Sequence, residues 1–254
     1  MISNVTVVSS LFDYPEIYQP SFLKNALKTF SETDIQIVRN SGLITTGSYY
    51  DKLYFYKIPK MLEHIENNVK TKYMLFLDAT DTNFYSSPID IIEKFENFGC
   101  SILFGSEKGL WPPTDYTHLY QTKNITGEYK YLNSGTYFGY TSEIIRHMKN
   151  IIKSNLQNGI DDQGKWTIEY LISNDIKIDN DNILFFSTYK SKNVIKIKDG
   201  IPHIIDYNPI IVHDNGPHDA ETEKIVKFLW ERYEYHGKVF HPQVCTLGWD
   251  LWYS

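Results

Sequence analysis

The sequence predicts an α/β protein with a doubly wound, Rossmann-like mixed sheet, mostly parallel in its first half and extended by antiparallel strands in its second. Two patterns carry this prediction. Short apolar runs alternate with amphipathic stretches up to residue 104, and the run YMLFL at Tyr73–Leu77 is apolar throughout. A continuously apolar strand is typical of a sheet covered on both faces, and strand–helix alternation favours parallel strands with right-handed crossovers.

The first 104 residues are predicted to form four strands and three helices. Pro20 opens the first helix and Pro59 falls in the first turn of the second, where the missing amide hydrogen of proline costs little. The strands are expected at Val5–Val8, Ile35–Val38, Tyr73–Leu77 and Ser101–Phe104. The helices are expected at Pro20–Phe30, Tyr54–Asn67 and Pro88–Phe95.

The second half has a less regular pattern. Gly105–Lys130 is long, polar and rich in Pro, Gly and aromatic residues, which predicts either a functional loop or elements hidden from pattern analysis. Further strands are expected at Thr136–Tyr140 and Ile210–His213, short antiparallel strands at Ile183–Phe186 and Val194–Ile197, and helices at Ser142–Asn155, Asp162–Ile172 and Ala220–Tyr235. No linker or repeat divides the chain, so we expect a single domain over residues 1–254.

Composition excludes several classes of function. The 254 residues include 25 Lys and Arg against 31 Asp and Glu, a net charge of −6, which argues against binding to nucleic acid. No apolar run approaches the roughly 20 residues of a membrane span. The start MISNVTVVSS lacks the features of a targeting signal, and Cys100 and Cys245 are the only cysteines, so we expect a cytoplasmic protein without a disulfide framework. The 15% aromatic content, with 20 Tyr, suits stacking on nucleobases or sugar rings.

Two carboxylates follow the central strand directly. Asp78 and Asp81 lie just beyond YMLFL, at the sheet edge where open α/β folds bind ligands. At about 4 Å and an effective dielectric of about 20, their repulsion is about 4 kcal/mol, which a cation between them would relieve. Oxygen ligands suit Mg²⁺ or Mn²⁺ bridging to a diphosphate. The alternative is that one Asp caps the turn and the other is solvated.

A histidine ends another apolar strand, in the turn HDNGP. His213 offers a nitrogen ligand, which shifts the preference from Mg²⁺ toward Mn²⁺. Asn215 and the backbone of Gly216 could donate to phosphate oxygens. An ordinary hydrogen-bonded loop histidine is the commoner alternative.

Two further polar segments adjoin predicted elements. Asn133, in LNSG, could hold a sugar hydroxyl through both its donor and its acceptor. Asp161 and Asp162 open a helix, so they either cap it or orient an acceptor hydroxyl.

Taken in order, the motifs DATDTNF, GLWP, YLNSGTYFGY, DDQ and HDNGP resemble the glycosyltransferase domain of the procollagen lysyl hydroxylase family. The resemblance runs from about Val5 to Pro217. It implies a GT-A fold that binds a UDP-sugar through Mn²⁺, with Mg²⁺ as the alternative ion. It also implies transfer of glucose or galactose to a hydroxyl group, such as that of hydroxylysine or galactosyl-hydroxylysine in a collagen-like protein. Retention of the anomeric configuration is expected by analogy.

The resemblance also assigns residues. A nucleotide-binding half is implied at 1–104, and an acceptor-side half with a C-terminal helix at 105–254. The implied metal ligands are Asp78, Asp81 and His213. The implied donor-site residues are Ser9, placed just past the first strand, Lys57, Thr80, Asn215 and Gly216. The implied residues around the transferred sugar and the acceptor are Asn133, Asp161, Asp162 and Trp111.

The chain departs from the family pattern at three places. Thr80 stands where the family often has Tyr near the uridine, Asp214 where it has Gly, and the stretch before Lys57 lacks the family's Trp and Gly-rich run. These departures keep open a non-catalytic relative that binds carbohydrate or UDP. A metal-dependent nucleotidyltransferase is a weaker alternative, because the segment after the first strand lacks a basic, Gly-rich phosphate loop. The choice of hexose, the acceptor and the oligomeric state stay open.

Overall fold

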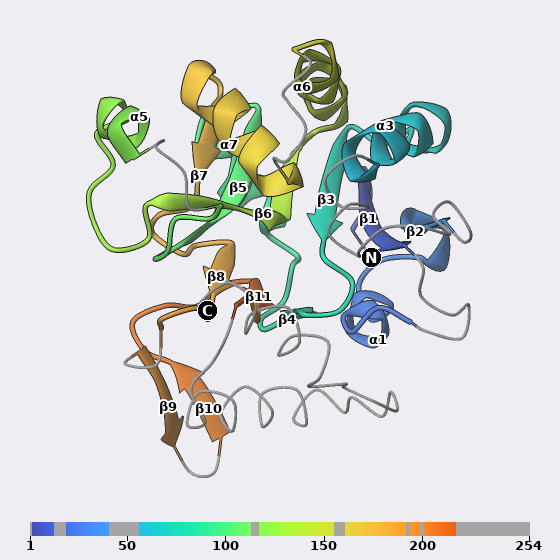
Figure 1. Ribbon diagram of the computed structural model, residues 1–254. Helices are drawn as coiled ribbons and strands as arrows, with labels where there is room; N and C mark the ends of the chain where they lie inside the picture. Colours follow the sequence, from blue (N-terminus) through green and yellow to red (C-terminus); the bar gives the residue numbers. More distant parts are fainter. Residues whose placement is uncertain are drawn as a thin grey trace, which may run out of the picture.

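A six-stranded mixed sheet lies at the centre of the structure, with strands in the order β2–β1–β3–β6–β5–β7 (Figure 1). The computed structural model describes residues 2–12, 19–40, 56–112, 117–154, 161–191, 194–198 and 201–216, so the helix predicted at Ala220–Tyr235 lies outside the described residues. The strands are β1 (Val5–Phe12), β2 (Ile35–Asn40), β3 (Tyr73–Leu77), β5 (Ile102–Glu107), β6 (Tyr131–Tyr140) and β7 (Ile176–Ile178).

Strand β6 runs against the other five. β1 pairs in parallel with β2 and β3, and β5 pairs in parallel with β7, whereas β6 pairs antiparallel with both β3 and β5. The predicted mixed, mostly parallel sheet is therefore confirmed. The strand expected at Thr136–Tyr140 is the second half of β6, which is inserted between β3 and β5.

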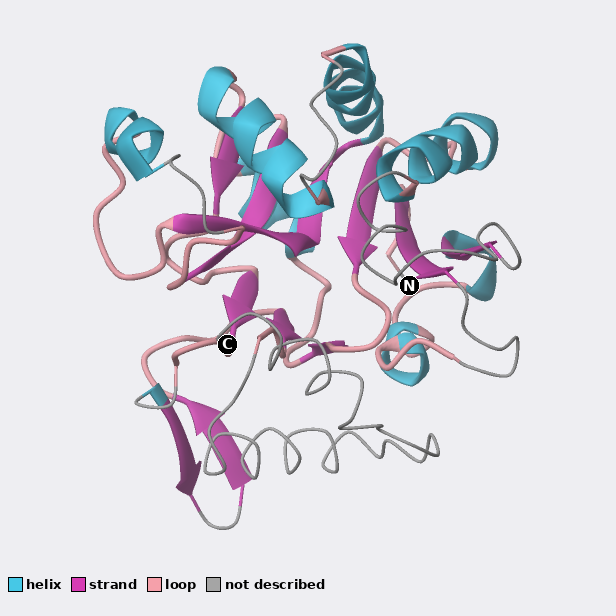
Figure 2. Cartoon of the chain, viewed as in Figure 1, coloured by secondary structure: helices cyan, strands magenta, loops and turns pink. Residues whose placement is uncertain are grey.

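Helices cover both faces of this sheet (Figure 2). α3 (Lys57–Asn68), α6 (Thr141–Lys153) and α7 (Asp162–Ile172) pack on one face, and α1 (Leu23–Ala26) and α4 (Ile91–Glu96) on the other. Met74 and Phe76 of β3 belong to the first core, while Leu75 and Leu77 belong to the second, which explains the continuously apolar run. No helix in the described part of the chain has the length and apolar composition needed to cross a membrane.

Two smaller sheets lie on the side of the central sheet to which the carboxyl ends of its parallel strands point (Figure 1). In the three-stranded sheet, β11 (Ile211–His213) is flanked by β4 (Thr82–Phe84), which is antiparallel to it, and β8 (Phe185–Ser187), which is parallel. A separate antiparallel pair is formed by β9 (Ile195–Lys198) and β10 (Ile201–Ile204). The strand predicted at Ile183–Phe186 corresponds to β8. Its predicted antiparallel direction is wrong, because β8 pairs in parallel with β11.

The helix predicted at Pro20–Phe30 is also wrong in extent, because only α1 is helical. Ser21 donates through Oγ to the carbonyl oxygens of Ala79 and Thr82, and Asn25 Nδ2 donates to Asn83 Oδ1. These bonds tie the segment to the loop after β3, so tertiary contacts outweigh the local helical pattern. The segment Gly105–Lys130 contains the end of β5 and α5 (Thr117–Thr122).

Replacing Phe138 of β6 would measure how much the inserted strand contributes to the stability of the second core. It is fully buried, stacks on Tyr73 at a centroid distance of 5.7 Å and meets Phe95 edge-on at 5.0 Å. We expect Phe138→Ala to lower the free energy of unfolding by about 3–5 kcal/mol, as for other aromatic truncations in cores. Ile172→Ala, at a 72% exposed side chain, serves as the control and should change it by less than about 0.5 kcal/mol in the same urea titration.

Candidate active site

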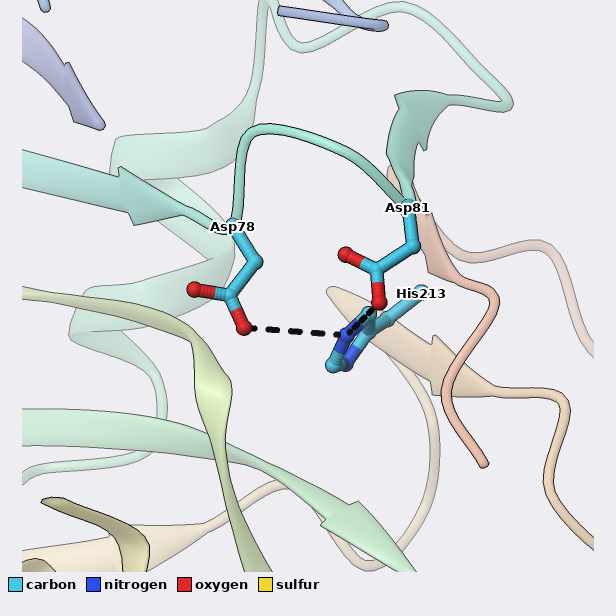
Figure 3. Close-up of side chains that lie close together, drawn as sticks. All are labelled: Asp78, Asp81 and His213. Atoms are coloured by element: carbon cyan, nitrogen blue, oxygen red, sulfur yellow. Dashed lines mark ion pairs between the residues drawn. The ribbon is translucent and has the colours of Figure 1, made fainter. Parts of the chain in front are cut away.

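Asp78, Asp81 and His213 converge on one point although they are distant in the sequence (Figure 3). The Nε2 atom of His213 lies 3.4 Å from Asp81 Oδ2 and 4.0 Å from Asp78 Oδ2. One potential ligand atom from each residue lies within 4.8 Å of the others. The two carboxylates are half-buried and the imidazole is buried. The predicted convergence is therefore present.

Backbone pairing produces this convergence. Asp78 follows the last residue of β3, and its N–H donates to the Gly135 carbonyl at 2.8 Å. The loop then enters β4, where Thr82 is paired in register with His213 of β11. The N–H of Asp214 completes the arrangement by donating to the Asp81 carbonyl at 2.7 Å. The register of β4 and β11 thus sets His213 beside Asp81.

Asn133 orients the imidazole of His213. Its Oδ1 lies 2.9 Å from His213 Nδ1 and accepts the N–H of Gly135 at 3.0 Å. Because a backbone N–H donates to it, this Asn133 atom is an acceptor, so Nδ1 of His213 must carry the hydrogen. Nε2 is then the nitrogen that faces the carboxylates. Metal-binding histidines are commonly held through the second ring nitrogen in this way, so the donor set fits a divalent ion.

Gly135 leaves no room for a side chain at this point. A Cβ on it would lie 2.1 Å from His213 Cε1 and 2.8 Å from Asp78 Oδ2. The bare backbone of the LNSG segment therefore packs directly against two of the three candidate ligands.

The charge around His213 favours a cation. Burial alone would lower the pKa of His213, but the carboxylates of Asp81 and Asp78 outweigh burial and raise the pKa above its ordinary value. The site therefore attracts positive charge at Nε2, which a proton or a metal ion supplies. Two carboxylates and one neutral imidazole could hold a divalent metal ion with further positions open to a ligand.

Lys57, the first residue of α3, joins this trio to the start of α7. Its Nζ lies 3.0 Å from Asp78 Oδ1 and 2.7 Å from Asp162 Oδ2, and the side chain is buried. Burial would lower the pKa of Lys57, but Asp162 and Asp78 raise it well above its ordinary value. The ammonium group therefore stays charged and holds Asp162 close to Asp78.

Asp161 performs the capping role predicted for one of the two acids and a second role as well. As the N-cap of α7, its Oδ1 accepts the Gly164 N–H at 2.7 Å, while Oδ2 accepts Nε1–H of Trp111 at 2.7 Å. Burial, followed by the charge of Asp162, raises the pKa of Asp161 to about 6. The half-buried Trp111 is thereby anchored to the acidic helix start.

Glu107, the last residue of β5, is a site residue that the sequence reasoning missed. Its buried carboxylate accepts from Gln163 Nε2 at 2.7 Å and from Asn215 Nδ2 at 2.6 Å. Burial raises the pKa of Glu107 to about 7, although hydrogen bonds from Gln163, Asn133 and Asn215 oppose this. Glu107 thus joins the DDQ, LNSG and HDNGP segments. The sequence feature that could have identified Glu107 is its position as a charged residue at the end of an apolar strand.

The remaining predicted donor-site residues are placed as follows. Thr80 lies in the loop and donates weakly to Asp81 Oδ1 at 3.5 Å. Asn215 is buried with its amide on Glu107, and Gly216 adopts a φ of +82° that favours glycine. Ser9 was expected just past the first strand, which is wrong. β1 continues to Phe12 along β2, so Ser9 is buried inside it and donates to the Leu77 carbonyl.

The mixed α/β sheet with helices on both faces places this chain in the GT-A-like class of α/β folds that the sequence predicts. Similarities to known proteins agree with this fold assignment. A glycosyltransferase involved in the glycosylation of the major capsid of PBCV-1 has a similar solved structure, with a TM-score of 0.54 and 16% identity. The similarity covers 88% of this chain and 98% of that one, and it supports the fold.

The family model for the PLOD GT domain matches residues 52–239. The chain therefore belongs to the PLOD GT domain family of glycosyltransferases, as the motifs predicted. It is 28% identical over 157 residues to procollagen-lysine,2-oxoglutarate 5-dioxygenase from Drosophila melanogaster. It is 29% identical over 174 residues to the multifunctional procollagen lysine hydroxylase and glycosyltransferase from Caenorhabditis elegans. These matches cover 56% and 63% of this chain but only 21% and 23% of the two relatives.

The Asn133 bond to His213 yields a prediction for metal affinity. Asn133→Ala removes the acceptor that fixes the imidazole, so we expect affinity for Mn²⁺ to fall about 10–100-fold, as for other residues that orient metal ligands. Titration calorimetry with Mn²⁺ measures the change. Asn67→Ala, which removes an exposed amide on α3, is the control; equal affinity in both variants would contradict the orienting role.

The close approach of Gly135 yields a second prediction. In Gly135→Ala the new methyl group must displace the His213 ring or the Asp78 carboxylate, so we expect Mn²⁺ affinity to fall at least about tenfold although every ligand is retained. The near-ultraviolet circular dichroism spectrum separates this local effect from unfolding. A folded variant with unchanged Mn²⁺ affinity would show that the trio does not bind the ion.

Proposed function

We propose that this chain is a Mn²⁺-dependent glycosyltransferase that moves glucose or galactose from a UDP-sugar to a hydroxyl acceptor. The acceptor class we propose is hydroxylysine or galactosyl-hydroxylysine in a collagen-like protein. The observation that carries the proposal is the convergence of Asp78, Asp81 and His213 beside the LNSG backbone. The imidazole ligand favours Mn²⁺ over Mg²⁺, and membership of the PLOD GT domain family supports a sugar-transfer reaction.

We propose that the donor side of the site holds a diphosphate. When bound, the metal ion supplies a Lewis acid that neutralises charge on the departing UDP. Lys57 holds its ammonium 3.0 Å from Asp78, and we propose that this positive charge lies near the diphosphate of the bound donor, where negative charge develops. The side-chain amide of Asn215 already donates to Glu107. We therefore propose that the backbone of Asn215 and Gly216, and not the Asn215 side chain, lies along the diphosphate.

We propose that the start of α7 forms the acceptor side of the site. One ammonium group, that of Lys57, separates the metal-side carboxylate of Asp78 from Asp162. Asp161 fixes the indole of Trp111 through a 2.7 Å hydrogen bond. We propose that Asp162 orients the acceptor hydroxyl and that Trp111 borders the path by which the acceptor enters. The acceptor oxygen would thus meet the sugar beside the metal trio.

The test is UDP release from a panel of UDP-sugars, with and without Mn²⁺. We expect Asp78→Asn combined with Asp81→Asn to lower Mn²⁺-dependent UDP release by about 10³-fold or more, because the stabilisation of the leaving group is lost. Asp181→Asn, at an exposed carboxylate, should release UDP at the wild-type rate.

Other outcomes separate the alternatives. Turnover that survives the double substitution contradicts the metal role. Metal-dependent binding of UDP without any turnover identifies a non-catalytic relative. Release of pyrophosphate in place of UDP identifies a nucleotidyltransferase.

A further inference from the structure

Tyr189 lies between two segments of the candidate site, against bare backbone. A Cβ on Gly109 would lie 2.3 Å from Cε1 of the Tyr189 ring, and a Cβ on Gly216 would lie 2.7 Å from Cδ2. Gly109 leads into the loop that carries Trp111, and Gly216 ends the turn that follows His213. The ring therefore packs against the acceptor-side loop at one edge and the metal-side turn at the other.

The turn after β8 holds Tyr189 in this position. The N–H of Thr188 donates to the His213 carbonyl at 3.0 Å, and its Oγ1 donates to Asp214 Oδ1 at 2.9 Å. The N–H of Tyr189 approaches Asn215 Oδ1 at 3.5 Å. The residue is thus fixed to the turn that directly follows the candidate metal ligand His213.

The packing of Tyr189 is not that of a core residue. Its side chain is half-buried, and the three apolar clusters formed by the described residues do not include it. The flanking Lys190 is exposed and places Nζ 5.0 Å from the ring centroid. An aromatic ring outside the core, next to the Asn215 amide and the Lys190 ammonium group and packed against the turn that follows His213, is suited to contact a ligand that combines polar groups with an apolar face.

We propose that Tyr189 is a specificity-determining residue whose ring packs against the C–H face of a pyranose in the transfer site. The inference rests on the proposed function and adds a residue outside the five motifs. The pyranose is either the hexose of the donor or a sugar of the acceptor, since the ring touches both sides of the site.

Gly109 provides a way to move the ring without altering it. The backbone of Gly109 does not have a positive φ, so an alanine there causes no backbone strain. The obstacle to Gly109→Ala is the contact of the new methyl group with the Tyr189 ring. In the Tyr189→Ala background that obstacle is gone. Gly109→Ala should therefore weaken sugar binding in the wild type and have little further effect in Tyr189→Ala, a coupling that a double-mutant cycle measures.

The experiment compares dissociation constants for UDP, UDP-glucose, UDP-galactose and a set of methyl pyranosides, all with Mn²⁺ and the full chain. The pyranosides are added to the UDP-loaded protein and followed by saturation-transfer NMR. We expect Tyr189→Ala to weaken either the UDP-hexoses or the pyranosides about five- to tenfold, the size of an aromatic contact, and to leave UDP unchanged. Tyr189→Phe should bind like the wild type.

The results separate the two sugars and the two proposals. Loss confined to the UDP-hexoses assigns the ring to the donor sugar, and loss confined to the pyranosides assigns it to the acceptor. Unchanged binding of both classes in a folded Tyr189→Ala variant overturns the inference while leaving the proposed function intact. Wild-type protein that binds no UDP-hexose overturns the proposed function itself.

Discussion

The pairing of β4 with β11 is the constraint on which the candidate site depends. These three-residue strands place Thr82 opposite His213, and the Asp214 N–H then closes on the Asp81 carbonyl. The ligand geometry is therefore set by backbone hydrogen bonds, which tolerate little displacement. Since side chains alternate across a strand, a register shift of one residue would turn His213 to the opposite face. Two acids from one loop and an imidazole from the far end of the described chain are thereby held together before any ion binds.

The site contains more carboxylate groups than positively charged groups, so some of its negative charges have no cationic partner among the described residues. Lys57 is shared between Asp78 and Asp162, and Glu107 is held by amide groups that carry no net charge. Buried carboxylates are costly unless they are paired or hydrogen-bonded. Burial is the main reason that the pKa values of Glu107 and Asp161 are raised, whereas the carboxylates of Asp81 and Asp78 raise the pKa of His213 against the effect of burial. A divalent cation is the simplest counter-charge for such an arrangement.

The sequence predicted the elements whose apolar residues form a recognisable run or period. α3, α6, α7, β3 and the short strand β11 follow from their apolar patterns, whereas β4 and β7, with three residues each, were not predicted. The direction of β8 comes from its partner. In the site, Asp78, Asp81 and His213 follow from their positions at strand ends. The role of Lys57 came from the family resemblance, since nothing in its local pattern distinguishes it. Glu107 was missed because the strand was ended three residues early, at Phe104.

The inserted strand β6 explains why a strand beginning contributes to a site otherwise built from strand ends. Parallel strands bring their carboxyl ends to one edge of a sheet, so Asp78, just after β3, and Glu107, at the end of β5, lie at the same edge with β6 between them. Because β6 is antiparallel, the residues at that edge come from its first half: Thr136 pairs with Leu77, and Asn133 with Gly105. The LNSG segment is thus placed between the two acidic strand ends. There Asn133 accepts a hydrogen bond from the imidazole of His213, and Gly135, which has no side chain, leaves room for the ring. A sheet with β5 directly beside β3 would bring the acids together but would lack the group that orients the histidine.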